Sequence, residues 1–95
     1  MDLNQDSIVG VSQKIEGPII YGERYFPRKG TSGWFIWSGE YTGKADFFQG
    51  THLKHLLQKF PELKKYLELE PGWSFVIDIS NGYEDTWFDE KKLKE

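Results

Sequence analysis

The chain has 95 residues, of which 38% are hydrophobic and 17% aromatic, and its formal net charge at pH 7 is -3. A chain of this length forms one domain with one modest core, which we expect to be built from a few large rings. The negative net charge disfavours nucleic acid as the main partner, because phosphate binding requires a clustered positive surface.

The absence of cysteine excludes disulfides and thiolate metal sites, and it suits the reducing cytoplasm. The longest apolar run is that of residues 34–37, far short of the roughly twenty residues that cross a bilayer. We therefore expect a cytoplasmic protein that makes no membrane contact.

Strand-forming residues fill the first part of the chain. Residues 1–7 are polar and unpatterned, which predicts a loose terminus. Residues 7–15 and 18–26 have the composition of strands, and the short connection between them favours a β-hairpin. The proline, glycines and adjacent cations of residues 27–33 then predict an exposed loop.

The third predicted strand, residues 34–38, begins with four large apolar side chains in a row. Alternation along a strand sends Trp34 and Ile36 to one face of the sheet, and Phe35 and Trp37 to the other. The strand therefore has no polar face, and both faces of the sheet need a cover at this point.

A helical period begins after residue 50. Apolar residues recur at i, i+3, i+4 and i+7, at Leu53, Leu56, Leu57 and Phe60. Thr51 is the expected N-cap, and Pro61 interrupts the helix so that a second short helix follows. We expect these helices to cover one face of the sheet and the loop 39–50 to cover the other, through Phe47 and Phe48. The terminus, a second subunit or a foreign partner is the alternative cover.

The last part of the chain has the pattern of a β-hairpin. Residues 73–79 alternate between apolar and polar side chains, as in a strand with one covered face. Asn81 and Gly82 favour a tight turn, and residues 83–88 return as the next strand. Residues 90–95 are expected to form a loose tail.

These elements predict a single α+β domain that spans residues 1–95. Its mainly antiparallel sheet has about five strands, and one or two helices within residues 51–67 pack on one face.

No group of residues in the sequence indicates a reaction, a metal ion or a cofactor. His52 and His55 have a spacing that can bring two imidazoles to one metal, but no HExxH motif or carboxylate triad lies nearby. The carboxylates lack the spacing of an acid–base pair, and the serines lack a nucleophile elbow. We therefore expect no catalytic residues, no metal site and no cofactor.

Charge is segregated along the second half of the chain. Residues 68–90 contain seven acids and neither Lys nor Arg, whereas residues 52–67 carry four lysines against one glutamate. The predicted hairpin gathers four of the acids without cationic neighbours: Glu84, Asp85, Asp89 and Glu90. Such a surface either keeps a small protein soluble or docks a basic partner.

A short aromatic motif carries a family resemblance. It reads Ser-Gly-Trp, apolar, aromatic, Ser-Gly and an acid, met by Ser32, Gly33, Trp34, Ile36, Trp37, Ser38, Gly39 and Glu40. With the later stretches "FPELKKYL", "EPGWSFVID" and "YEDTWFDE", it resembles a group of small bacterial domains, formerly a domain of unknown function, now grouped with the immunity proteins of polymorphic toxin systems. The resemblance covers roughly residues 8–89. It implies an α+β fold and, for the toxin-associated members, binding and silencing of a cognate toxin.

Our leading hypothesis is a non-enzymatic, immunity-like module of the cytoplasm that occludes a cognate toxin or another basic protein. In this hypothesis the acids steer association and the aromatic residues anchor the complex. The predicted partner-binding residues are Trp37, Glu40, Tyr83, Glu84, Asp85, Trp87, Asp89 and Glu90. We expect a monomer or a weak homodimer.

Two alternatives remain open at this point. One is a small-ligand-binding domain with Trp34 or Trp37 in an aromatic pocket, and the other is a homodimer that hides the aromatic face.

Overall fold

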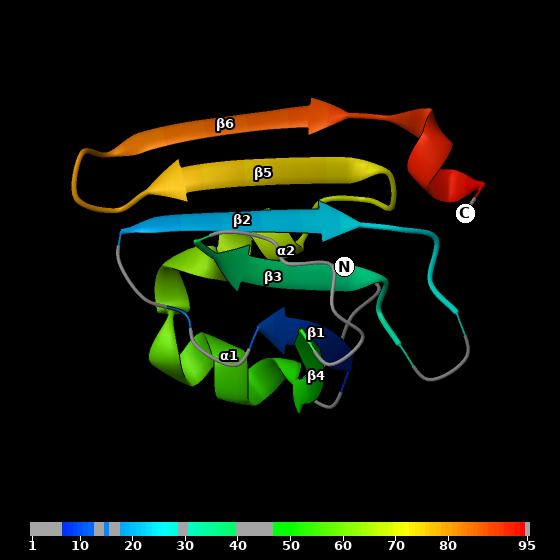
Figure 1. Ribbon diagram of the computed structural model, residues 1–95, viewed down its shortest axis with the longest axis horizontal. Coiled ribbons are helices and arrows are strands. Elements are labelled where there is room, and N and C mark those ends of the chain that lie inside the picture. Colours follow the sequence, from blue (N-terminus) through cyan, green and yellow to red (C-terminus); the bar gives the residue numbers. More distant parts are fainter. Residues whose placement is uncertain (1–6, 13–14, 16–17, 29–30, 40–46, 95) are drawn as a thin grey trace.

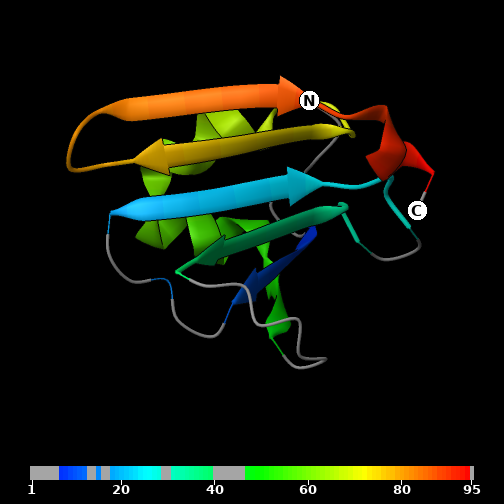
Figure 2. The ribbon, with the colours of Figure 1, turned by 45° about the horizontal axis from the view of Figure 1, so that its top comes forward.

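The computed structural model describes residues 7–12, 15, 18–28, 31–39 and 47–94, and within them six strands form one sheet with helices packed against it (Figure 1). The elements in chain order are β1 (Ile8–Ser12), β2 (Ile19–Arg24), β3 (Trp34–Ser38), β4 (Phe48–His52), α1 (Leu53–Lys59), the 3-10 helix η1 (Pro61–Leu63), α2 (Lys64–Leu67), β5 (Trp73–Asp78), β6 (Tyr83–Phe88) and the 3-10 helix η2 (Glu90–Leu93). The helices α1 and α2 lie on one face of the sheet (Figure 2). The expected α+β class is confirmed.

The sheet has the strand order β4-β1-β3-β2-β5-β6, which differs from the predicted hairpin of the first two strands. That hairpin is wrong, because β1 pairs in parallel with β3 and antiparallel with β4, while β2 pairs with β3 and β5. Gly10 shows how β1 fits between its neighbours: a Cβ placed there would lie 2.8 Å from Cδ1 of Phe35. The ring of Phe35 thus packs over the bare backbone of β1.

The strand β4 was not expected, since residues 39–50 were predicted to form a loop. It pairs with β1 over five residues. Gly50 and the exposed Gln49 lower its β-propensity, so the stretch lacks the alternation by which the other strands were recognised. Thr51 lies in this strand and is not the N-cap, because α1 starts at Leu53 with His52 in the cap position.

The core fills the layer between the sheet and the helices. Its buried apolar residues are Val9, Ile20, Trp34, Ile36, Leu53, Leu56, Leu63, Tyr66, Leu67, Phe75 and Ile77. The predicted helical stripe is confirmed, since Leu53 and Leu56 are buried and the other two members of the stripe pack against the core. The predicted face change along β3 is also confirmed, because Trp34 and Ile36 are buried in this layer.

The core layer also contains the charged side chain of Arg24, which is 1% exposed. Its Nε donates a hydrogen bond to the carbonyl of Ser32 (3.0 Å), and its Nη1 donates to the carbonyl of Leu69 (2.7 Å). The guanidinium group lies 5.9 Å from the ring centroid of Trp34, a cation–π distance. Arg24 therefore joins β2 to the chain before β3 and to the chain after α2.

Candidate functional site

The sheet face opposite the helices is the candidate site, and the strand register defines its central row. Trp37 pairs with Tyr21, Tyr21 with Val76, and Val76 with Asp85. These four residues therefore share one row across β3, β2, β5 and β6, and strand spacing separates its ends by about 14 Å. The register brings Trp37 and Asp85, two of the predicted contact residues, to the same face.

Aromatic rings cover the β3 end of this open face. Trp37 stacks on Tyr21 with the ring centroids 5.5 Å apart, and Phe48 lies edge-on to Phe35 at 5.0 Å and to Trp37 at 6.0 Å. Phe47 extends the cluster by an edge contact with Phe48 at 4.8 Å. Phe47 and Phe48 thus pack on this face as expected, although Phe48 belongs to β4, and residues 40–46 of the predicted loop lie outside the described residues. Phe35 and Trp37 nevertheless stay only half-buried, so part of this aromatic surface reaches solvent.

A hollow of about 330 Å³ adjoins the aromatic cluster, a volume in the range of small-ligand sites. Phe35, Trp37 and Phe48 form its apolar wall, while Glu23 and Arg28 contribute opposite charges. The hollow can accommodate an apolar group that also carries a polar end.

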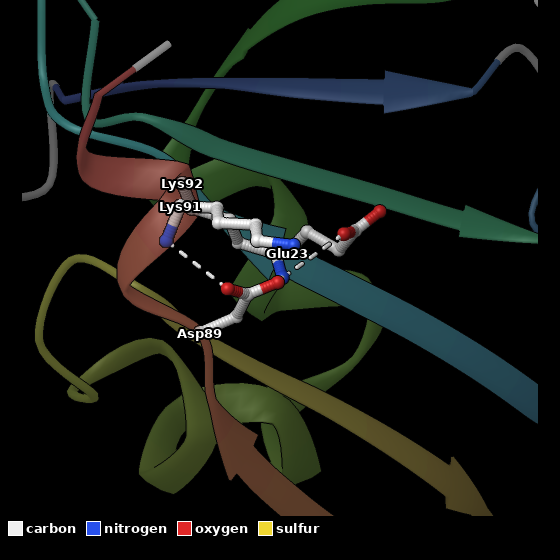
Figure 3. Close-up of polar contacts among 4 residues, drawn as sticks. All are labelled: Glu23, Asp89, Lys91 and Lys92. Carbon is white, nitrogen blue, oxygen red and sulfur yellow. Dashed lines mark hydrogen bonds and ion pairs between the residues drawn. The ribbon is translucent and has the colours of Figure 1, made fainter.

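The helix η2 covers the open face beside this hollow, through the buried side chain of Lys92 (Figure 3). Its Nζ lies 3.5 Å from Oε2 of Glu23 and 3.6 Å from Oδ2 of Asp89. Asp89 also caps η2, since its carboxylate accepts a hydrogen bond from the backbone N–H of Lys91 at 3.0 Å. That N–H, and secondarily the charge of Lys92, hold the pKa of Asp89 below its ordinary value. Sequence reasoning missed this contact because Glu23 and Lys92 come from opposite ends of the chain.

Ser74 lies on the same face of the sheet as the contact between Lys92 and Glu23. In the strand register it sits between Glu23 of β2 and Trp87 of β6. Its Oγ is buried and has no hydrogen-bond partner among the residues that the structure describes. A buried hydroxyl without a partner destabilises a fold by about 1 to 3 kcal/mol.

Two of the four acids expected to lack cationic neighbours, Glu84 and Asp89, do have them. Glu84 forms an ion pair with Lys65 at 3.0 Å and accepts a hydrogen bond from the hydroxyl of Tyr66, and Asp89 lies near Lys92. The expectation was wrong because it compared charges along the sequence, whereas α2 packs beneath the hairpin and brings Lys65 to β6.

The contact between α2 and β6 changes the titration of all three groups. The Tyr66 hydroxyl, followed by Lys65, holds the pKa of Glu84 below its ordinary value. The hydrogen bond to Glu84 raises the pKa of Lys65, and burial raises the pKa of Tyr66. Glu84 is therefore a structural link to α2 as well as a surface acid.

The strand β6 forms one edge of the sheet, and all six of its residues are exposed. Tyr83 and Trp87 are 55% and 42% exposed, and they share the open face with Asp85. Phe88, on the other face, lies beside Trp73 with the ring centroids 5.7 Å apart. The structure thus brings Tyr83, Asp85 and Trp87 together, as the sequence suggested, but it turns Glu84 away from them.

Three further sequence features remain to be compared with the structure. His52 and His55 lie with their ring centroids 5.7 Å apart, and no group of three metal-ligating side chains occurs in the described part of the chain. No described helix is long and apolar enough to cross a membrane. Glu40 lies outside the described residues.

A comparison with protein families identifies the family of the chain. The model of the Imm33-like domain matches residues 1–89, which is nearly the whole chain. The chain belongs to the Imm33-like family. The resemblance to an immunity-protein-like family is thereby confirmed. Neither a curated protein nor a solved structure matches the chain.

In this Imm33-like domain, the first half of the aromatic motif builds the fold. Ser32 Oγ accepts a hydrogen bond from the N–H of Trp34 at 3.2 Å, and Trp34 donates its indole N–H to the carbonyl of Leu67. Gly33 has a φ of 89°, and a Cβ there would lie 2.2 Å from the carbonyl oxygen of Tyr25. These residues position β3 in the sheet, and Trp37 is the motif residue whose large side chain reaches the open face.

Proposed function

We propose that this Imm33-like domain binds a cognate toxin, or another basic protein, and neutralises it by occlusion without catalysing a reaction. The family supports an immunity role. The observation that carries the proposal is the exposed trio of Tyr83, Asp85 and Trp87 on one face of an edge strand. Aromatic side chains beside a carboxylate combine buried anchoring with electrostatic steering.

The proposed contact surface comprises the eight residues predicted from the sequence. Their surroundings suggest which of them anchor the partner and which steer its association. Tyr83, Trp87 and the half-buried Trp37 supply the anchors. Asp85 and Glu90 supply steering charge, whereas Glu84 and Asp89 also hold α2 and η2 in place. Glu40 joins the proposal through its position in the motif after Trp37. The proposed compartment is the cytoplasm, and the proposed state is a monomer or a weak homodimer.

Affinity capture from lysate of the native host tests this function. The tagged domain is washed first at low and then at high salt, and mass spectrometry identifies what each wash releases. A basic protein that is retained at low salt and released at high salt supports the proposal. A bait without any partner contradicts it.

Association kinetics with the captured partner then test the steering acids. The double reversal Asp85→Lys and Glu90→Lys should slow association at low salt while the domain stays folded. The double reversal Glu62→Lys and Glu68→Lys is the matched control, since it changes the net charge equally at exposed positions in and after the helices. Equal association rates for the two doubles would contradict the steering role.

The aromatic hollow supports a second candidate function, the binding of a small ligand. Its volume of about 330 Å³ and its wall of Phe35, Trp37 and Phe48 carry this candidate. A metabolite panel should then quench tryptophan fluorescence in the parent domain and not in the Trp37→Phe variant. A flat response of the parent domain would argue against a ligand site.

A further inference from the structure

We propose that the outer edge of β6 accepts an extended basic segment of the partner as an added, seventh strand. This inference rests on the proposed function, because it specifies how the partner is held. It concerns the backbone of β6 in addition to its side chains, and four observations lead to it.

The backbone groups of β6 point alternately toward β5 and away from the sheet. The N–H of Asp89, just after β6, donates a hydrogen bond to the carbonyl of Gly72, just before β5, at 2.9 Å. This bond shows which residues of β6 direct their backbone groups toward β5. Since backbone groups alternate in direction along an antiparallel pair, the residues that point outward are Glu84, Thr86 and Phe88. Three N–H and three C=O groups are thereby available along one exposed edge.

This edge lacks most of the features by which sheet edges usually avoid pairing. Natural edge strands are shortened, bulged or covered, or they carry proline or charged side chains, above all lysine. The charged residues of β6 are the acids Glu84 and Asp85, which repel an acidic strand and attract a basic one. The register between β5 and β6 runs unbroken over six residue pairs, and β6 contains neither lysine nor proline. Its aromatic residues and Thr86 have high β-propensity.

The opposite edge of the sheet differs. There β4 contains Gly50 and leads directly into α1, with the N–H of Leu53 bonded to the carbonyl of Ser7. A glycine within the strand weakens it as a template, and the helix ends it. Of the two edges of the sheet formed by the described strands, β6 is therefore the one suited to strand addition.

Charge identifies the occupant as a basic segment. Asp85 lies at the centre of the exposed trio, and it forms no ion pair with the residues that the structure describes. A cation on the added strand would lie opposite Asp85, and apolar residues two positions to either side would lie beside Tyr83 and Trp87. A second copy of this chain would bring another set of acids to the same edge, so it fits less well than a basic protein.

The test uses the peptide Lys-Val-Thr-Lys-Thr-Val-Lys as the probe, with both ends blocked, because its central lysine has a valine two positions to either side on the same face. Amide exchange is followed residue by residue by NMR on the full chain. In the free protein, the N–H groups of Glu84, Thr86 and Phe88 should exchange fast, and those of Asp85 and Trp87 should exchange slowly. The peptide should protect the three outward groups. A twin peptide with N-methyl groups on alternate residues, placed on its pairing edge, should not protect them.

Thr86→Pro provides the matching change in the protein. Because the N–H of Thr86 points outward, proline there removes no hydrogen bond to β5. The affinity for the peptide should fall about tenfold or more, because the variant loses one hydrogen bond to the added strand and proline disrupts the pairing along this edge. Thr86→Val is the control, since it keeps the N–H and the β-branched shape. If the proline variant does not fold, the exchange pattern of the parent chain decides the question.

The outcomes separate this inference from the proposed function. Unchanged exchange of the three outward amides at millimolar peptide would overturn strand addition, as would equal peptide affinity in a folded Thr86→Pro variant. A host partner captured equally by the parent and a folded Thr86→Pro variant would also overturn it, while the proposed function would stand. Amide protection by the peptide without any host partner would support strand addition and contradict the proposed function.

Discussion

Glu84 and Asp85 are consecutive in β6, yet their side chains lie on opposite faces of the sheet. Glu84 contacts Tyr66 and Lys65 of α2, while Asp85 shares the open face with Tyr83 and Trp87. Two neighbouring acids therefore have different roles. One stabilises the contact between helix and hairpin, and the other belongs to the proposed binding surface.

The contact of Glu84 with α2 predicts a dependence of stability on pH. The pKa of Glu84 is lowered in the folded state, first by the Tyr66 hydroxyl and then by Lys65. Its contribution is therefore present above the ordinary value of 4.5 and is lost as the pH falls through the lower, folded pKa. Urea unfolding measured between pH 7 and pH 3 should show a smaller loss of stability for Glu84→Gln than for the parent chain. Glu62→Gln is the control, and a curve parallel to the parent for Glu84→Gln would refute the link.

The buried Arg24 predicts a large loss of stability on substitution. In Arg24→Met the carbonyls of Ser32 and Leu69 lose their donors, and the free energy of unfolding should fall by about 2 to 4 kcal/mol. Arg28→Met is the control, because that side chain is exposed. Urea midpoints within experimental error of each other for the two variants would show that Arg24 is dispensable.

The hydroxyl of Ser74 predicts a substitution that leaves stability unchanged or raises it. Ser74→Ala removes a buried Oγ without a described partner, so the free energy of unfolding should rise by up to about 1 kcal/mol. Ser80→Ala is the contrasting variant, since the Ser80 Oγ donates to Asp78 at 2.7 Å and its loss should lower stability. Thermal unfolding measures both changes, and a clear fall in the melting temperature of Ser74→Ala would contradict the prediction.

The two glycines of the aromatic motif predict unequal effects of alanine. Gly33 and Gly39 both have positive φ, 89° and 72°, but only Gly33 lies against backbone, the carbonyl of Tyr25. Gly39→Ala should cost about 1 to 2 kcal/mol for the left-handed conformation alone. Gly33→Ala should cost more, about 3 kcal/mol or above, because the backbone must also move. Chemical denaturation of both variants makes the comparison, and equal losses would show that the close approach does not matter.

Local patterns in the sequence predicted the elements, and long-range contacts determined the rest of the fold. The apolar period from Leu53 and the alternation of β5 are visible within a few residues, so both were recognised. The pairing of β1 with β3 was not, because a short connection between two strand-like stretches favours a hairpin locally. The strand β4 was missed because Gly50 interrupts its pattern.

The candidate site was predictable to a similar degree. Tyr83, Asp85 and Trp87 alternate along one strand, so their common face follows from the sequence. The pairing of Glu84 with Lys65, and that of Lys92 with Glu23, join segments far apart in the chain. The sequence offered no local sign of either contact, nor of the burial of Arg24.

The position of β1 also determines the order in which the domain can assemble. As the chain leaves the ribosome, β1 emerges first, but both of its partners, β3 and β4, are synthesised later. The first strand must therefore remain unpaired until β3, the third of the six strands in the chain, has been made, whereas β5 and β6 can close as a local hairpin at the end. Folding that depends on such distant pairing is slow, and a stalled or truncated chain that ends before β3 would expose β1 without a partner strand.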